Sequence, residues 1–142
     1  MEEQIITPYL LYKDCDAALK FLSDAFGFEE VLRYTGEEGY VNHAEARING
    51  ASVYMGDPGD KYQNPKELGQ ETVGIYVVID EDVDAHCERA RAAGAEINEE
   101  PADQDYGHRR YTATDPEGHV WYFAAPVKDV APAAWGATAS AS

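Results

Sequence analysis

The chain repeats itself at a fixed distance, and this repeat restricts the folds that the sequence can adopt. The segment DCDAALKFLSDAFGFEE begins at Asp14, and the similar segment DVDAHCERARAAGAEI begins at Asp82, 68 residues further on. A second pair of similar segments, NGASVYMG and EGHVWYFA, keeps the same spacing and aligns Tyr54 with Tyr122. Self-similarity at a constant period indicates a structural unit that occurs twice.

Each copy of the repeat predicts one helix and four strands. Asp14 and Asp82 are good N-caps, and an apolar stripe with helical spacing follows the first of them as far as Gly27. One strand-like segment precedes each helix. Three more follow it, at 29–34, 40–48 and 51–55 in the first copy and at 95–98, 109–114 and 119–124 in the second. The predicted fold class is therefore α+β, built from two βαβββ repeats.

Composition along the chain suggests where these units begin and end. The 142 residues suffice for one ordinary domain or for two small fused modules. We expect a first module at 1–57, a linker loop rich in Gly, Pro and charge at 58–71, and a second module at 72–126. Residues 127–142 have no helical or strand period. They are predicted to form a flexible tail, whose Trp135 either docks on the body or stays free.

The formal net charge of −16 restricts the partners of the chain. Nucleic acids and anionic membrane surfaces require basic patches, so neither is expected to bind. The acidity favours a cationic ligand, or it merely keeps the chain soluble. No apolar run approaches the ~20 residues of a membrane span, and the start MEEQIITPYL lacks the features of a signal peptide. We therefore expect a cytoplasmic protein in which Cys15 and Cys87 are reduced and structural.

Several motifs together resemble the vicinal oxygen chelate superfamily, which includes glyoxalase I, extradiol dioxygenases, fosfomycin-resistance enzymes and bleomycin-resistance proteins. These motifs are the two Asp-x-Asp-Ala helix starts, the AFGF end of the first helix, the segment YGHRR and the turn DPEGH. The resemblance covers residues 4–126, and residues 7–57 are most similar to the PhnB-like or bleomycin-resistance-like branch. It implies that the repeats form an eight-stranded open cup with the helices outside, and that the protein is a homodimer.

The resemblance also implies where a metal would bind. Members that use a metal place His or Glu on the first and last strands of each copy, and the corresponding positions here are Thr7, Tyr54, Gly74 and Tyr122. None of these residues offers an imidazole, a carboxylate or a thiolate. We therefore expect no bound metal at these positions and no other cofactor.

The histidines have other predicted roles. His119 faces away from Tyr122, because side chains alternate along a strand, and it is expected to pack or to anchor a turn. His86 lies in the second helix and is expected to be solvated. His43 and Glu45 share one face of a predicted strand. They are either an alternative metal pair or an exposed pair without a ligand.

With no metal ligands in place, the expected wall of the cup consists of tyrosines, namely Tyr9, Tyr54, Tyr76 and Tyr122. Phenol rings around a concavity can stack on a flat or cationic organic molecule and hydrogen-bond to it. Alternatively, the tyrosines simply fill the cup as core. In the segment DYGHRRY, one of His108, Arg109 and Arg110 is a candidate ligand contact or dimer brace. Arg109 matches the family's Gly-x-Arg position and is the residue selected, with a structural ion pair as its alternative role.

Two classes of function follow from this comparison. One is a non-catalytic protein that sequesters a small organic molecule, as the bleomycin-resistance members do. The other is an enzyme, either a diverged lyase, dioxygenase or isomerase of the superfamily or a metal-free catalyst that uses a tyrosine as acid. The sequence contains no nucleophile with an adjacent base and no Gly-rich phosphate loop. Because the metal ligands of the enzymes are missing, we favour the binding protein.

Overall fold

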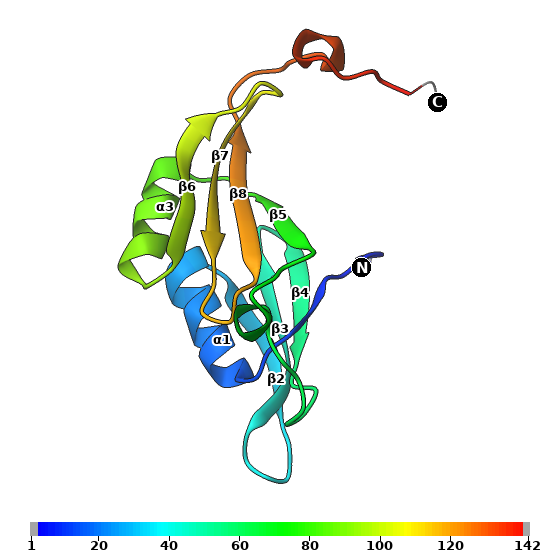
Figure 1. Ribbon diagram of the computed structural model, residues 1–142, viewed down its shortest axis with the longest axis vertical. Helices are drawn as coiled ribbons and strands as arrows, with labels where there is room; N and C mark the ends of the chain where they lie inside the picture. The colour runs from blue at the N-terminus through cyan, green and yellow to red at the C-terminus, as the bar shows by residue number, and fades with distance from the viewer. Residues whose placement is uncertain (1–2, 141–142) are drawn as a thin grey trace.

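The structure, a computed structural model, describes residues 3–140 of the chain, and each half runs strand, helix, strand, strand, strand (Figure 1). The elements of the first half are β1 (Tyr9–Leu11), α1 (Cys15–Phe21), its π-helical continuation η1 (Leu22–Phe26), β2 (Glu29–Thr35), β3 (Val41–Ile48) and β4 (Ala51–Gly56). Those of the second half are β5 (Gly74–Val78), α3 (Val83–Ala92), β6 (Glu96–Asp103), β7 (His108–Thr114) and β8 (Val120–Pro126). The one-turn helix α2 (Pro65–Leu68) lies between the halves, and the 3-10 turn η2 (Pro132–Trp135) follows β8.

Both halves form a four-stranded mixed sheet with the same order of strands. The orders are β1-β4-β3-β2 in the first sheet and β5-β8-β7-β6 in the second. In each sheet the first strand pairs in parallel with the last, and the other pairs are antiparallel. The predicted fold class, α+β with two βαβββ modules, is confirmed. Residues 1–2 of the predicted first module and 141–142 of the predicted tail lie outside the described residues.

Helices α1 and α3 lie on one side of the sheets (Figure 1), and buried residues of both modules form one core. Trp121 and Phe123 of β8 point to this side and are fully buried. Phe26 of η1 packs on both, with its ring centroid 5.7 Å from that of Trp121 and 4.5 Å from that of Phe123. The helix of the first module therefore completes the core of the second, and burial of these large rings stabilises both halves together.

His86 of α3 is part of this core, so the prediction of a solvated His86 is wrong. Its Nδ1 lies 2.6 Å from the hydroxyl of Tyr111, and its Nε2 lies 2.8 Å from the carbonyl oxygen of Phe26. Burial lowers the pKa of His86. A neutral ring with its proton on Nε2 satisfies both contacts, because Nε2–H donates to the carbonyl and Nδ1 accepts from the tyrosine. The buried face of α3 comprises Val83, His86, Cys87 and Ala90.

The turn Asp115–Gly118, between β7 and β8, links the modules a second time. The hydroxyl of Tyr12, which follows β1, donates a hydrogen bond of 2.6 Å to the Asp115 carboxylate. The Glu117 carboxylate accepts from the backbone N–H groups of Lys13 at 2.7 Å and Asp14 at 3.0 Å, just before α1. A carboxylate is favourable there because the helix start carries partial positive charge. This turn therefore fastens the second module to the first helix.

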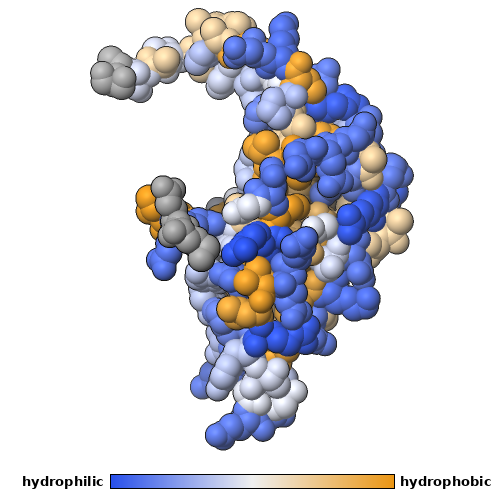
Figure 2. Space-filling model, turned by 180° about the vertical axis from the view of Figure 1, so that it is seen from behind, coloured by the Kyte–Doolittle hydropathy of each residue, from blue (hydrophilic) through white to orange (hydrophobic). Residues whose placement is uncertain are grey.

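The molecule is hollowed on the side away from the helices, and the C-terminal segment overhangs that side (Figure 2). Cys15 and Cys87 are both buried and free, as the sequence predicts. Burial raises the pKa of the Cys15 thiol to about 12. Within residues 3–140, no helix is long and apolar enough to span a bilayer.

Candidate ligand-binding site

The four tyrosines selected from the sequence lie on the hollowed side of the sheets, in two pairs. Strand pairing places Tyr9 beside Tyr54 in the first sheet and Tyr76 beside Tyr122 in the second. The rings of the first pair are nearly perpendicular at 88°, with centroids 6.2 Å apart. Those of the second pair are stacked at 20°, with centroids 6.0 Å apart. Tyr9 and Tyr76 are exposed, so these rings do not fill a closed core in the single chain.

A histidine from the third strand of each module joins each pair. The hydroxyl of Tyr9 lies 3.0 Å from Nδ1 of His43, and the hydroxyl of Tyr76 lies 2.7 Å from Nδ1 of His108. The two histidines do not occupy equivalent positions in the repeat. His43 pairs with Gly56, whereas Arg110 occupies the corresponding place in the second sheet. The modules therefore reach a similar tyrosine–histidine contact from different strand positions.

The second sheet carries a larger group of connected side chains, here called the second-module cluster: Tyr76, Tyr106, His108, Arg110 and Tyr122. The Tyr106 hydroxyl lies 3.1 Å from that of Tyr76 and accepts a hydrogen bond of 3.0 Å from Nη1 of Arg110. The guanidinium of Arg110 lies over the Tyr122 ring, 5.3 Å from its centroid. Tyr76, Tyr122, Arg110 and Tyr106 thus form a closed ring of contacts. Sequence reasoning selected two of these five residues and considered two more, but it passed over Tyr106.

The positive charge of Arg110 in this cluster is balanced by a neighbouring carboxylate. Arg110 is mostly buried and forms an ion pair with Glu99 at 3.2 Å. Its Nε is buried and has no hydrogen-bond partner in the described part of the chain. Desolvation and the hydrogen bond with Tyr106 raise the pKa of Tyr76, so its phenol stays neutral near pH 7. The cluster therefore offers flat rings and neutral hydroxyls, whereas the Arg110 Nε–H is buried and does not face a ligand.

Arg109, the arginine selected from the sequence, is not brought together with the tyrosines. Side chains alternate along β7, so Arg109 points to the side opposite Arg110. Its guanidinium pairs with Asp84 of α3 at 2.8 Å and with Asp103 of β6 at 3.1 Å. These contacts match the structural ion pair that the sequence left open as its alternative role. The side on which Arg109 lies depends on the register of β7 against β8, which the sequence alone did not predict.

The four positions at which metal-using members hold their ligands do not fit a metal in this chain. Their side chains supply two phenols, a hydroxyl and a hydrogen, which do not match the imidazole and carboxylate ligands of such sites. In addition, the ring of Tyr122 lies against the backbone of Gly74. A Cβ added there would be 2.5 Å from Cε1 of Tyr122. The tyrosine ring therefore takes the space that a longer side chain at position 74 would need.

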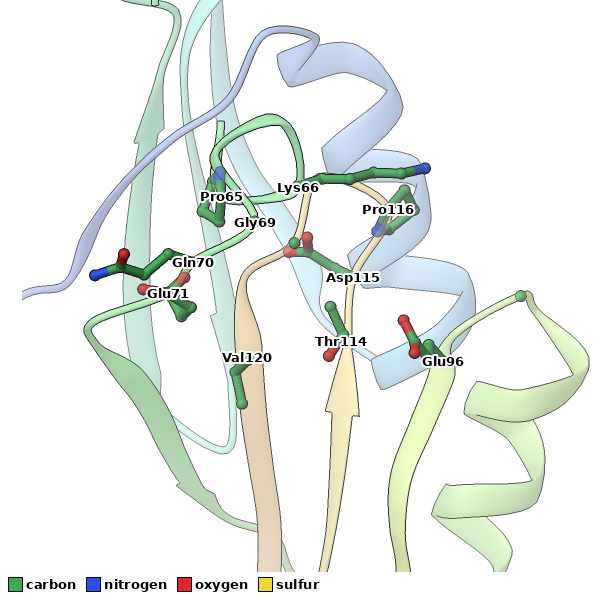
Figure 3. A pocket seen from close by; sticks show the side chains of 12 residues that line it. Pro65, Lys66, Gly69, Gln70, Glu71, Glu96, Thr114, Asp115, Pro116 and Val120 are labelled. Atoms are coloured by element: carbon green, nitrogen blue, oxygen red, sulfur yellow. The ribbon is translucent and has the colours of Figure 1, made fainter. Parts of the chain in front are cut away.

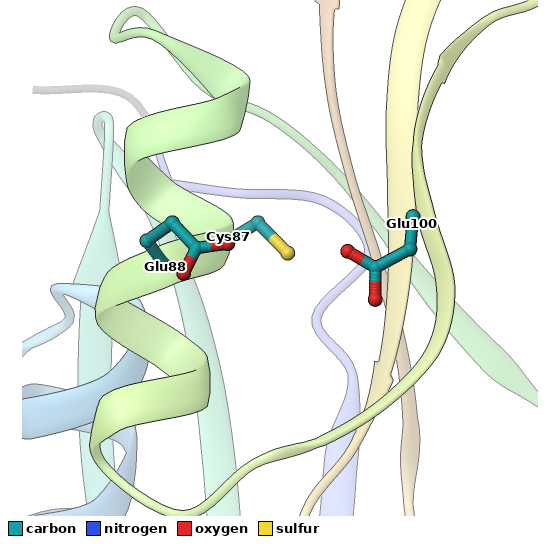
Figure 4. Close-up of side chains that lie close together, drawn as sticks. All are labelled: Cys87, Glu88 and Glu100. Atoms are coloured by element: carbon teal, nitrogen blue, oxygen red, sulfur yellow. The ribbon is translucent and has the colours of Figure 1, made fainter.

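Other potential metal ligands are no better placed. His43 and Glu45 do share one face of β3, but no third His, Cys, Asp or Glu of residues 3–140 completes a group with them. Cys87, Glu88 and Glu100 do lie close together (Figure 4). Arg91 already forms ion pairs with both of these glutamates. The arginine therefore supplies the positive charge that a metal would bring to this group.

A separate cavity of about 520 Å³ lies at the end of the second sheet, where β7 ends and β8 begins (Figure 3). The linker around α2 forms one wall, and the polar residues that line the cavity are Lys66, Gln70, Glu71, Glu96, Thr114 and Asp115. None of the site residues selected from the sequence lines it. His119 lies beside it and is nearly buried, with Nε2 2.8 Å from the Leu11 carbonyl oxygen and Nδ1 3.3 Å from Glu71. It thus holds the linker and β1 together.

Comparison with known proteins gives a match that extends across both copies of the repeat. A family described as the Glyoxalase/Bleomycin resistance protein/Dioxygenase superfamily matches residues 5–123, which include both modules. The chain belongs to this superfamily. An uncharacterized protein of Mycobacterium bovis is 36% identical over 133 residues, covering 90% of this chain and 87% of the relative. An uncharacterized Mycobacterium tuberculosis protein is 36% identical as well, covering 90% of this chain and 78% of the relative.

Two solved structures are similar to this chain. TioX from Micromonospora sp. ML1 is 31% identical, with a TM-score of 0.69 over 90% of this chain and 100% of that one. The fosfomycin resistance protein FosX from Listeria monocytogenes, complexed with Mn(II) and sulfate, is 25% identical. Its TM-score is 0.64, over 89% of this chain and 93% of that one. One of these similar proteins was thus solved with a metal, whereas the four expected ligand positions of this chain lack suitable donors.

Proposed function

We propose that this protein belongs to the bleomycin-resistance-like or PhnB-like branch and binds a flat organic molecule without a metal. The supporting observation is the second-module cluster, in which the Tyr76 and Tyr122 rings are stacked on the hollowed face and Arg110 lies over Tyr122. Rings held by neighbours lose little entropy when they stack on a ligand. The tyrosine hydroxyls would fix the ligand's orientation. The biological role would be sequestration of an aromatic drug or metabolite.

Overall charge favours a ligand with positive charge. The net charge of −16 raises the concentration of cations near the protein. The positive charge of Arg110 repels cations near the cluster, but the ion pair with Glu99 offsets much of this repulsion. A planar cation such as proflavine is therefore the first probe, with 2-naphthoate as a planar anion of similar size and bleomycin as a cationic drug.

The expected result is that proflavine or bleomycin binds and raises the melting temperature, whereas 2-naphthoate binds more weakly. Tyr122→Ala should weaken binding by about 1–3 kcal/mol, or roughly 5- to 150-fold, because an anchoring ring is lost. Tyr34→Ala is the matched control for the second pair, since Tyr34 is an exposed tyrosine of the first sheet, where it is paired with His43. Tyr54→Ala measures the contribution of the first pair. Fluorescence titration gives the dissociation constants.

Two outcomes would contradict this proposal. If none of the planar compounds binds, or if Tyr122→Ala and Tyr34→Ala bind equally well, the tyrosines are not the ligand site. If elemental analysis of the purified protein finds stoichiometric manganese, zinc, nickel or iron, the protein is not metal-free. In that case the diverged lyase, dioxygenase or isomerase becomes the better hypothesis, with His43 and Glu45 as the first ligands to replace.

We also propose that the protein is a homodimer. In the described residues, β1 and β5 each pair with a neighbour on one side only, and exposed strand edges favour further pairing. Apolar side chains are exposed near these edges, notably Ile5 at 97%, Ile6 at 82% and Val73 at 64%. Light scattering is expected to give twice the chain mass of 15.7 kDa. A mass that stays at that of one chain across micromolar concentrations would rule the dimer out.

A further inference from the structure

The C-terminal segment is attached to the sheet that carries the second-module cluster. The backbone N–H groups of Val127 and Lys128 donate to the carbonyl oxygen of Gly107, at 2.8 and 3.1 Å. Gly107 lies in the turn between β6 and β7, immediately after Tyr106. Its lack of a side chain allows this approach, because a Cβ there would collide with the Lys128 carbonyl oxygen. The segment therefore leaves β8 directly beside the cluster.

Trp135 returns to the cluster from the far end of this segment. The turn η2 presents its indole to Tyr106, with ring centroids 5.9 Å apart and an interplanar angle of 62°. The hydroxyl of Tyr106 points into the cluster, where it contacts Tyr76 and Arg110. Between the sheet and the segment lies a cavity of about 520 Å³, bordered by Tyr106, His108 and residues 126–130. Figure 2 shows the segment overhanging the hollowed side.

The contacts of Trp135 contribute little to the stability of the fold. The indole remains 43% exposed, and no residue of η2 is buried. Residues 136–140 are Gly, Ala, Thr and Ser, which supply no large apolar side chain to hold the turn in place. A large aromatic ring with more than two fifths of its surface still exposed gains free energy when it packs on an additional flat partner.

We propose that Trp135 is a ligand contact, and that the segment 127–140 closes one end of the site formed by the second-module cluster. This inference rests on the proposed function. A planar molecule that stacks on Tyr122 and Tyr76 reaches the Tyr106 end of the cluster, where the indole covers it. Binding then orders the segment, and the segment slows the departure of the ligand.

The test is Trp135→Ala, with proflavine as the probe. The variant should keep the melting temperature of the free protein, because substitutions at such exposed positions usually change stability by less than about 0.5 kcal/mol. Its affinity for proflavine should fall roughly 5- to 10-fold, mainly through faster dissociation, because one stacking contact is lost. Trp135→Phe should keep part of the affinity. Thr138→Ala is the control for a change within the segment that leaves the indole in place, since Thr138 is exposed and does not border the cavity.

A second measurement tests the docking of Trp135 in the free protein as well as with proflavine bound. Trp121 is fully buried, so acrylamide quenching of tryptophan fluorescence reports mainly on Trp135. Tyr106→Ala should increase quenching in the free protein, and proflavine should decrease it in the wild type. Unchanged or higher affinity of Trp135→Ala, together with weakened binding by Tyr122→Ala, would overturn the inference and leave the proposed function standing. If proflavine and bleomycin do not bind the wild type, the proposed function fails, and unchanged quenching in Tyr106→Ala shows separately that the indole is not docked.

Discussion

Asp115→Ala is expected to lower the melting temperature by about 10 °C, because it removes about 3 kcal/mol from the free energy of unfolding. Asp115 is only 4% exposed. One carboxylate oxygen accepts from the Tyr12 hydroxyl at 2.6 Å and from Nε1 of Trp121 at 3.1 Å. The other accepts from the backbone N–H groups of Glu117 and His119, at 3.0 and 3.1 Å. Alanine would leave four donors without this partner, two of them on buried side chains.

Two further variants separate the parts of this effect. Asp115→Asn can still accept from the two backbone groups through its amide oxygen, but its NH₂ cannot accept from Tyr12 and Trp121. It should therefore fall between the wild type and Asp115→Ala. Asp16→Ala is the control for loss of an exposed carboxylate, since Asp16 forms an ion pair with the exposed Arg33 at the surface. Thermal unfolding followed by circular dichroism is the measurement, and an Asp115→Ala midpoint equal to that of Asp16→Ala would contradict the explanation.

Gly118→Ala is expected to cost about 3 kcal/mol, clearly more than Gly94→Ala. The two glycines have almost the same backbone conformation, with φ of +96° and +100°. Both replacements therefore carry a similar backbone cost, of about 1 kcal/mol. A Cβ at Gly94 would meet no atom within 4 Å, whereas one at Gly118 would lie 3.0 Å from Cα of Lys66 and closer still to its nitrogen.

The difference in free energy of unfolding between Gly118→Ala and Gly94→Ala measures how closely the linker is packed on the Asp115–Gly118 turn. The backbone N–H of Lys66 donates to the Glu117 carbonyl oxygen at 3.0 Å, and this bond would have to break or lengthen in Gly118→Ala. Chemical denaturation of both variants gives the two free energies. Equal losses would mean that the linker moves aside freely, and that its contacts with the turn contribute little to stability.

Much of the fold was predictable because it depends on local patterns that occur twice. The aligned pair Tyr54 and Tyr122 placed two strands correctly, and alternation along β8 separated Tyr122 from Trp121 and Phe123. Hydrogen bonding extends β6 from the predicted 95–98 to Glu96–Asp103. This strand is longer than its composition suggests, because Pro101 and several acidic residues are poor strand formers. Pairing with β7 continues on both sides of two irregularities, which leave out Asn98, Glu100 and Pro101.

The parts that escaped prediction depend on contacts between distant segments. His86 has a polar side chain, and only the Phe26 carbonyl and the Tyr111 hydroxyl make its burial favourable. Arg109 and Arg110 are adjacent, and their choice of side depends on the pairing of β7 with β8. Tyr106 lies in a turn without any pattern of its own. The tyrosines were found because the repeat marks their strands, although whether they bind a ligand stays a prediction.

The contacts between the two modules also have a consequence for folding kinetics. Tyr12 and Asp115 are 103 positions apart in the chain, and Phe26 and His86 are 60 apart, whereas β2, β3 and β4 are joined by short turns. The antiparallel strands can pair early, because closing a short loop costs little entropy, and the docking contacts form later. Contacts that form after the rate-limiting step affect the unfolding rate more than the folding rate. The Asp115–Gly118 turn and His86 therefore determine mainly how long the native state persists once it has formed.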